Sequence, residues 1–363
     1  MDDLPYETLP YASAPPTAPS VPAVLHVLPV MEAPTPDADA PQTGAPALEA
    51  PAEVAPAPAA GAHGLGDPAF SGPKPPLYVP HPAAAVSARR DVDASVVPDV
   101  VLDGATHGPL TVRAASVRGD AHRYHAEPRQ DSLVVARLGG ADPSGLLLLG
   151  VADGVGSAPR SHLGSRMVCR DIVRFLDEYA EELSECLRTG NEKALTSMVS
   201  SAVGRVAAEL ERAAAGAGHQ PADWATTLRV VLVPLDPLVR GRVLFTVGDG
   251  GTARLRGGVW EHDVVGRADD SGAAGIIDTR TAALPSTRHA EVDLFTALPG
   301  DLLVLCTDGL STPLEGDEEM RRFLGRAWGA DAPGLADFLW QLQYRVKSYD
   351  DDRTAVCLWE ANA

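Results

Sequence analysis

The sequence predicts an α+β fold in which antiparallel β-sheets form a central sandwich and helix pairs flank it (α-β-β-α), preceded by a disordered N-terminal arm. Three observations predict it. Short runs rich in Val and Leu are bounded by turn-forming residues, which is typical of strands. Long stretches between them carry apolar residues at helical spacing. The order of the segments also differs from the strict strand–helix alternation of a parallel sheet.

The arm differs from the rest of the chain in composition. Of the 32 prolines in the 363 residues, 21 lie in residues 1–100. An Ala/Pro-rich segment with few aromatic residues buries little apolar area, so ordering it would not be compensated. We therefore expect a disordered arm over residues 1–95 and one folded domain over residues 96–363.

The domain begins with strands and continues with helices. Six apolar runs predict strands, in chain order: Leu133–Arg137, Leu146–Ala152, Thr227–Val233, Arg242–Val247, Leu302–Cys306 and Ala355–Trp359. Apolar residues at helical spacing predict helices over three further stretches: Leu163–Leu187, Leu195–Leu210 and Leu335–Val346.

Charge and cysteine content exclude several classes of protein. The chain has 30 Lys and Arg against 49 Asp and Glu, a net charge of −19, whereas nucleic acids and anionic membranes attract positive surfaces. No apolar run approaches the roughly 20 residues that span a bilayer. The acidic start Met1-Asp2-Asp3 is unlike a secretory signal. The four cysteines are widely spaced and read as reduced thiols. We expect a cytoplasmic protein that binds neither nucleic acid nor membrane.

Four aspartates at the ends of predicted strands are the strongest chemical signal. Asp131 precedes the first strand, Asp153 and Asp308 each follow an apolar run and precede a glycine, and Asp351 precedes the last strand. Carboxylates that converge would repel one another unless a cation joins them. Oxygen ligands suit Mg²⁺ or Mn²⁺ rather than zinc. An Asp-Gly pair alone is usually a turn, so the prediction depends on all four together.

These aspartates belong to six short motifs that occur in a characteristic order. The motifs are Gln130-Asp131, Val151-Ala152-Asp153-Gly154-Val155-Gly156-Ser157, Ala225-Thr226-Thr227-Leu228, Val247-Gly248-Asp249-Gly250, Thr307-Asp308-Gly309-Leu310 and Asp351-Asp352-Arg353-Thr354. Together they resemble the protein phosphatase 2C family, in particular its bacterial branch with Gln-Asp and Asp-Gly-Val-Gly-Ser motifs. The resemblance covers about residues 112–360 and identifies residues 96–363 as a phosphatase 2C-like catalytic domain.

The resemblance implies a metal-dependent phosphatase acting on phosphoserine and phosphothreonine in proteins. By position, Asp153 would bridge two Mg²⁺ or Mn²⁺ ions, with the Gly154 carbonyl completing one ligand shell. Asp308 and Asp351 would hold one ion and Asp131 would act on the other, so Asp153 and Asp308 are the expected catalytic residues. A hydroxide shared by the ions would attack phosphorus directly. A third ion would use Asp308 or Asp223, and Asp223 is the weaker candidate.

The sequence departs from the family pattern at three positions. Val155 stands where many relatives carry a histidine that could act as general acid. His122 is our candidate for that role, with His125 and His162 as alternatives. In addition, Gly250 stands where a serine often follows the aspartate, which affects turn geometry more than catalysis.

The third departure concerns the phosphate. Ala126 stands where many relatives carry a phosphate-binding arginine. Arg123 and Arg129 flank it and are the candidates to replace it, and Arg160 follows the second motif. An arginine offers a planar fork for phosphate oxygens, although most exposed arginines are simply solvated.

Three alternatives compete with this interpretation, and the sequence argues against the first. A haloacid-dehalogenase-type phosphatase would use Asp103, but that chemistry needs a second carboxylate at position 105, which is alanine. A catalytically inactive phosphatase-like domain would bind a phosphoprotein or a regulator. An adaptor working through residues 1–95 would lose its function without them, whereas an enzyme would still hydrolyse a small substrate. The preferred interpretation is a monomeric enzyme with a phosphorylated protein substrate and a cognate Ser/Thr kinase.

Overall fold

The computed structural model describes residues 70–72, 77–78, 92–140, 145–262, 283–346 and 349–361. The chain divides into two compact units, Met1–Gly64 and Leu65–Ala363, and every described residue belongs to the second. Most of the arm expected over residues 1–95 therefore lies outside the described residues. Within that range the structure places a short strand, β1 (Phe70–Ser71), and a short helix, α1 (Val92–Ser95).

Two antiparallel sheets form the centre of this unit. The first contains five strands, in spatial order β10 (Glu291–Thr296), β7 (Gly241–Val247), β6 (Leu228–Pro234), β5 (Leu146–Ala152) and β4 (Ser132–Leu138). The second contains six strands, in spatial order β2 (Val100–His107), β3 (Leu110–Val117), β13 (Arg353–Glu360), β11 (Leu302–Cys306), β8 (Gly251–Arg256) and β9 (Val259–His262). The predicted α+β sandwich is confirmed.

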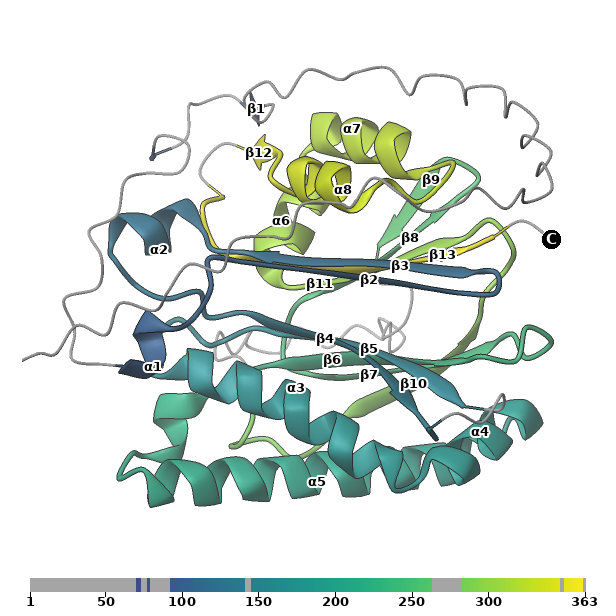
Figure 1. Ribbon diagram of the computed structural model, residues 1–363, viewed down its shortest axis with the longest axis horizontal. Helices are drawn as coiled ribbons and strands as arrows, with labels where there is room; N and C mark the ends of the chain where they lie inside the picture. Colours follow the sequence, from purple (N-terminus) through teal and green to yellow (C-terminus); the bar gives the residue numbers. More distant parts are fainter. Residues whose placement is uncertain are drawn as a thin grey trace, which may run out of the picture. The chain divides into compact units, whose positions relative to one another are not determined.

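Helices cover the outer face of each sheet (Figure 1). The five-stranded sheet packs against α3 (Ser161–Asp177), α4 (Ala180–Thr189) and α5 (Glu192–Gly216). The six-stranded sheet packs against α6 (Asp308–Gly316), α7 (Glu318–Trp328) and α8 (Leu335–Leu342). Two single turns complete the fold: α2 (Asp120–Tyr124) and the 3₁₀ turn η1 (Pro221–Trp224).

The central strands are apolar on both faces because both faces are covered. In β5, Leu147 and Leu149 pack between the sheets, whereas Leu146 and Leu148 pack against α3 and α5. Side chains alternate between the faces of a strand, so a strand buried on both faces reads as a continuous apolar run. This confirms the six predicted strands. β5 and β11 have the predicted ends, and the ends of the other four differ by at most two residues.

The remaining elements differ from the expectation in part. The predicted helix over Leu163–Leu187 is two helices, with the break at Glu178 and Tyr179. The last predicted helix ends at Leu342, and Val346 belongs to β12 (Arg345–Val346). This two-residue strand pairs in parallel with β1. Strands β2, β3, β8, β9 and β10 were not predicted; β2 is an edge strand and mostly exposed, so it lacks the apolar signal.

A buried ion pair joins the two sheets. The Arg242 guanidinium of β7 donates to Glu360 Oε1 of β13 at 3.0 Å from Nε and 2.7 Å from Nη2, and both side chains are almost fully buried. Arg240 adds a weaker, half-exposed contact at 3.2 Å. Removing one member of such a pair leaves the other charge buried without its partner.

Replacing Arg242 with methionine should therefore lower the free energy of unfolding by about 3 kcal/mol. Urea denaturation followed by circular dichroism measures this. The double variant Arg242→Met/Glu360→Met should regain most of the loss, because it removes both charges. A single variant as stable as the parent would show that Arg240 neutralises Glu360 by itself.

Candidate metal centre and active site

Strand pairing brings the four predicted aspartates to one edge of the sandwich. In the five-stranded sheet, Ser132 of β4 pairs with Ala152 of β5. Asp131 and Asp153 therefore leave this sheet side by side. In the six-stranded sheet, Cys306 of β11 pairs with Ala355 of β13, so Asp308 and Asp351 lie beyond the ends of neighbouring strands. Each sheet supplies two carboxylates.

Three of the four aspartates line one cavity of about 110 Å³. Its lining consists of His122, Gln130, Asp153, Gly154, Val155, Gly156, Thr227, Asp249, Asp308 and Asp351. Asp131 lies next to this cavity and lines a neighbouring one of about 470 Å³. The carboxylate of Asp131 accepts a hydrogen bond of 2.7 Å from Thr307 Oγ1, which joins it to the residue preceding Asp308.

The electrostatics of the clustered aspartates indicate crowded negative charge. Burial, followed by the charges of Asp131 and Asp308, raises the pKa of Asp153 well above its ordinary value. Burial and the charge of Asp352 raise the pKa of Asp131 to about 8. Burial likewise raises the pKa of Asp351. A divalent cation offsets such repulsion, and carboxylate oxygens are the ligands that Mg²⁺ and Mn²⁺ prefer. The donor set fits these ions.

Two glycines allow neighbouring segments to pack closely at the site. A Cβ at Gly154 would lie 2.8 Å from Ser161 Oγ and 2.9 Å from the Gln130 carbonyl oxygen. A Cβ at Gly309 would overlap the carbonyl oxygen of Asp352. The Asp-Gly pairs are thus required for packing at the site, beyond the turns that the sequence alone suggested.

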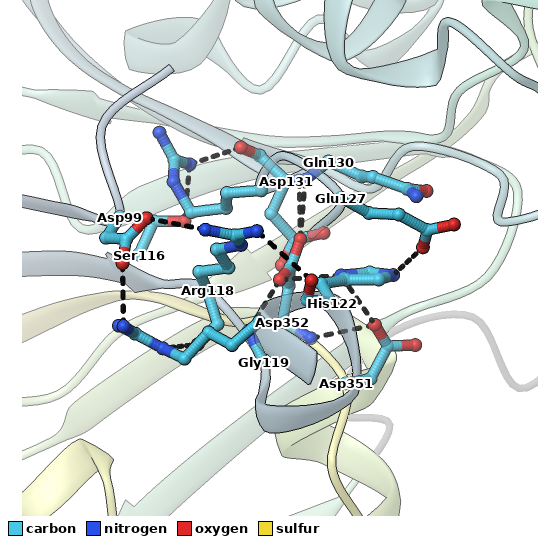
Figure 2. A network of polar contacts seen from close by, with 12 residues as sticks. Asp99, Ser116, Arg118, Gly119, His122, Glu127, Gln130, Asp131, Asp351 and Asp352 are labelled. Carbon is cyan, nitrogen blue, oxygen red and sulfur yellow. Dashed lines mark hydrogen bonds and ion pairs between the residues drawn. The ribbon is translucent and has the colours of Figure 1, made fainter. Parts of the chain in front are cut away.

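Asp352, which sequence reasoning did not single out, is the centre of a hydrogen-bond network (Figure 2). Its Oδ1 accepts from Gly119 N at 2.7 Å and from His122 Nδ1 at 2.9 Å. Its Oδ2 accepts from Gln130 N at 2.5 Å and from Asp131 N at 3.3 Å. Burial favours a raised pKa, but the hydrogen bond and charge of His122 and the backbone donors lower it below its ordinary value.

His122 reaches the cavity from α2 with its ring held on both sides. Besides Asp352, Nδ1 lies 3.8 Å from Asp351 Oδ1, and Nε2 lies 4.0 Å from Glu127 Oε2. Burial opposes the charged ring, but the hydrogen bond and charge of Asp352, with Asp351 and Glu127, raise the pKa of His122 to about 9. His122, Asp351 and Asp352 also bring one ligand atom each within 4.8 Å. Because the oxygens of Asp352 already accept four hydrogen bonds, we interpret this trio as a hydrogen-bond network.

The two arginine candidates bind protein groups and do not line the 110 Å³ cavity. Arg123 Nη1 donates to Asp99 Oδ2 at 2.6 Å. Arg129 is buried and donates to Pro98 O at 3.1 Å, to Ser116 Oγ at 2.6 Å and to the carbonyl oxygen of Asp131. In this geometry Arg129 fixes the backbone of Asp131.

The other candidates also lie outside the cavity lining. His125 faces Tyr78, with ring centroids 6.3 Å apart, and His162 is buried in α3. Asp223 accepts from Gln220 N at 3.0 Å and caps η1. The exposed Asp103 of β2 accepts from Gly104 N. Asp249, by contrast, lines the cavity. Asp249 belongs to the motif Val247-Gly248-Asp249-Gly250, but the sequence alone predicts no role for it.

Membrane insertion finds no support in the helices. Within the described ranges, none combines the length and the apolar character that crossing a bilayer requires.

Comparisons with known proteins agree with this architecture. A family model described as protein phosphatase 2C matches residues 118–335. No curated protein sequence matches the chain significantly. Among solved structures, the chain is similar to PppA, a regulatory component of T6SS in Pseudomonas aeruginosa, with 19% identity and a TM-score of 0.46 over 71% of this chain and 99% of that one.

Two further solved structures are similar. The serine/threonine phosphatase of S. agalactiae is 16% identical with a TM-score of 0.48, covering 69% of this chain and 99% of that one. The catalytic domain of the serine/threonine protein phosphatase PstP, in complex with 2 manganese ions, is 21% identical with a TM-score of 0.44, covering 71% and 98%. The family model spans more than half of the chain. The chain therefore belongs to the protein phosphatase 2C family.

Proposed function

We propose that this protein is a metal-dependent serine/threonine protein phosphatase that hydrolyses phosphoserine and phosphothreonine. The observation that carries the proposal is the convergence of carboxylates from both sheets on one small cavity. Asp153, the Gly154 carbonyl, Asp308 and Asp351 would hold two Mg²⁺ or Mn²⁺ ions, with Asp131 acting directly or through water. PstP, one of the solved structures to which this chain is similar, was solved in complex with 2 manganese ions.

Bound ions would supply a water molecule activated near neutral pH and would offset the charge of the phosphoryl group. The chain contributes position and proton transfer. Thr307 fixes the carboxylate of Asp131, and Asp352 fixes the backbone of Gln130 and Asp131. His122 lines the cavity, and we assign it the role of general acid toward the leaving serine or threonine oxygen.

The contacts of the two arginine candidates bear on which group binds phosphate. Arg123 and Arg129 are engaged elsewhere. Either arginine could contact phosphate only after giving up its present partner. We therefore expect the metal ions to carry most of the phosphate binding, and a third ion would add to it.

A metal titration of the full-length protein tests the proposal. We expect release of phosphate from a phosphothreonine peptide and from para-nitrophenyl phosphate, dependent on Mn²⁺ or Mg²⁺ and abolished by chelation. The alternative, a catalytically inactive domain that binds a phosphoprotein or a regulator, predicts metal-induced thermal stabilisation without turnover. Inactivity with both ions, in protein that the ions do stabilise, would overturn the enzymatic proposal in favour of this alternative.

The cellular context is proposed on the same basis. The substrate would be a phosphorylated protein, with a cognate Ser/Thr kinase opposing the reaction, and we expect a cytoplasmic monomer. The acidic charge of −19 disfavours nucleic acid and anionic membranes as partners.

A further inference from the structure

Two short pieces of the proline-rich segment contact the folded unit beside the site. In the first, Phe70 and Ser71 of β1 pair in parallel with Arg345 and Val346 of β12. The Ser71 side chain is buried, and its Oγ donates to Asp317 Oδ1 at 2.8 Å. Figure 1 shows β1 beside β12, above α2.

The second piece ends at Tyr78. Its ring lies 4.9 Å from the ring of Tyr124 and 6.3 Å from that of His125. Its carbonyl oxygen accepts a hydrogen bond of 2.7 Å from Arg345 Nη2. Tyr78 therefore contacts both β12 and the C-terminal end of α2. The neighbouring Leu77 points to solvent, with 74% of its surface exposed.

Arg345 connects these contacts to the helix that carries His122. The same Nη2 that binds Tyr78 donates to Asp120 Oδ2 at 2.6 Å, and Asp120 is the first residue of α2. Both side chains of this ion pair are largely buried. Ala121 N also donates to the Asp350 carbonyl oxygen at 3.0 Å. One guanidinium thus joins the proline-rich segment, β12 and α2.

Helix α2 depends on such contacts for its position. It has five residues, buries none of them, and has no side-chain hydrogen bond at its N-cap, Gly119. An isolated helix this short is not stable in water. Its position must therefore come from contacts with the rest of the fold. Asp352 holds the His122 ring directly, and the groups at the two ends of α2 help to hold the helix itself.

We propose that β1 and Tyr78 act together as a docking element, in which β1 pairs with β12 and Tyr78 packs on the aromatic end of α2, and that this docking helps to position His122 at the cavity. β1 and β12 form a two-stranded sheet of their own. As in other strand-pairing modes of recognition, backbone pairing would give affinity and side chains would give specificity. The functional unit then begins before Phe70 rather than at residue 96. The role assigned to His122 rests on the proposed function, whereas the docking itself does not.

Full-length variants provide the first test. Tyr78→Ala and Arg345→Gln should each lower kcat for a phosphothreonine peptide about tenfold, a part of what a general acid contributes. The kcat for para-nitrophenyl phosphate should change little, because para-nitrophenolate leaves without a proton. Leu77→Ala is the matched control and should behave as the parent. Unchanged kcat in both variants, or equal loss on both substrates, would overturn the positioning role.

Truncation and rescue provide the second test. Removing residues 1–64 should leave both activities intact, whereas removing residues 1–91 should reproduce the selective loss. A synthetic peptide of residues 66–80 added to the shorter protein should restore kcat, and a scrambled peptide should not. Failure of the peptide to restore activity, in shorter protein that is folded by circular dichroism, would contradict docking.

A peptide-binding measurement tests the docking independently of any enzymatic activity. A labelled peptide of residues 66–80 should bind the protein lacking residues 1–91 in a fluorescence anisotropy titration, and Arg345→Gln in that protein should abolish binding. If the parent is inactive on both substrates with both metals, the proposed function fails. Saturable, Arg345-dependent binding would still confirm the docking element, and its absence would overturn it.

Discussion

Asp153→Asn should reduce kcat by about a thousandfold or more, because Asp153 is the carboxylate expected to contact both metal ions. The kcat should fall for a phosphothreonine peptide and for para-nitrophenyl phosphate alike, since both reactions need the same nucleophile. Steady-state phosphate release at saturating Mn²⁺ measures the loss. Wild-type kcat in this variant would refute the metal-bridging assignment of Asp153.

The same variant should keep its fold. Removing one of several mutually repelling carboxylates relieves repulsion in the metal-free protein, so the Tm of the variant should equal or exceed that of the metal-free parent. Added Mn²⁺ should raise the Tm of the parent more than that of the variant. Asp103→Asn is a suitable control: Asp103 is exposed on β2, so both activities should persist. Their loss would instead support the haloacid-dehalogenase-type alternative.

His122→Asn should distinguish substrates by their leaving groups. We expect kcat for a phosphothreonine peptide to fall by about 100-fold, the lower part of the range for general acid catalysis. Hydrolysis of para-nitrophenyl phosphate should fall far less, since its leaving group needs no proton. Parallel assays on the two substrates at one metal concentration measure the difference.

Asp352→Asn supplies the matched comparison for His122. Asparagine can still accept from His122 Nδ1, but the variant removes the negative charge beside the ring. When the amide oxygen faces His122, the amide nitrogen replaces the oxygen that accepts from Gln130 N and Asp131 N. We therefore expect a loss on both substrates, unlike the selective loss in His122→Asn. If His122→Asn lowers both activities equally, His122 serves the metal site rather than the leaving group.

The sequence predicts the central strands of the sandwich well because strands buried on both faces consist of continuous apolar residues. β5 and β11 lie between a second sheet and a layer of helices, so every position in them is apolar. β2 lies at an edge and β10 carries charged residues along with its apolar ones. β2 is assigned by its pairing with the adjacent β3, and β10 by its pairing with β7, which is distant in sequence. The apolar pattern within a strand does not contain this information.

The four aspartates were predictable for a related reason. Each lies next to a strand that the apolar pattern identifies, and the strand register then brings them together. The bond between His122 and Asp352 joins residues that are 230 positions apart, and neither residue is marked by its neighbours. Only the fold shows that they meet.

The contacts of Tyr78 could not be predicted from the composition of the surrounding sequence. A segment rich in alanine and proline has no periodicity, and a single tyrosine in it gives no sign of a partner. The segment is attached by backbone pairing of Phe70 and Ser71 with β12 and by the Arg345 guanidinium, which donates to the Tyr78 carbonyl oxygen. Neither kind of contact leaves a hydrophobic pattern in the sequence.

The division of the aspartates between two sheets makes the spacing of the sandwich part of the catalyst. Asp131 and Asp153 extend from one sheet, and Asp308 and Asp351 from the other. The core between the sheets, which includes Leu149, would set the separation of the two pairs of proposed ligands. A cation bound by aspartates from both pairs would link the two sheets. Conversely, smaller side chains in this core, even far from the cavity, would change the distance between the two pairs of aspartates and so weaken binding of the proposed ions.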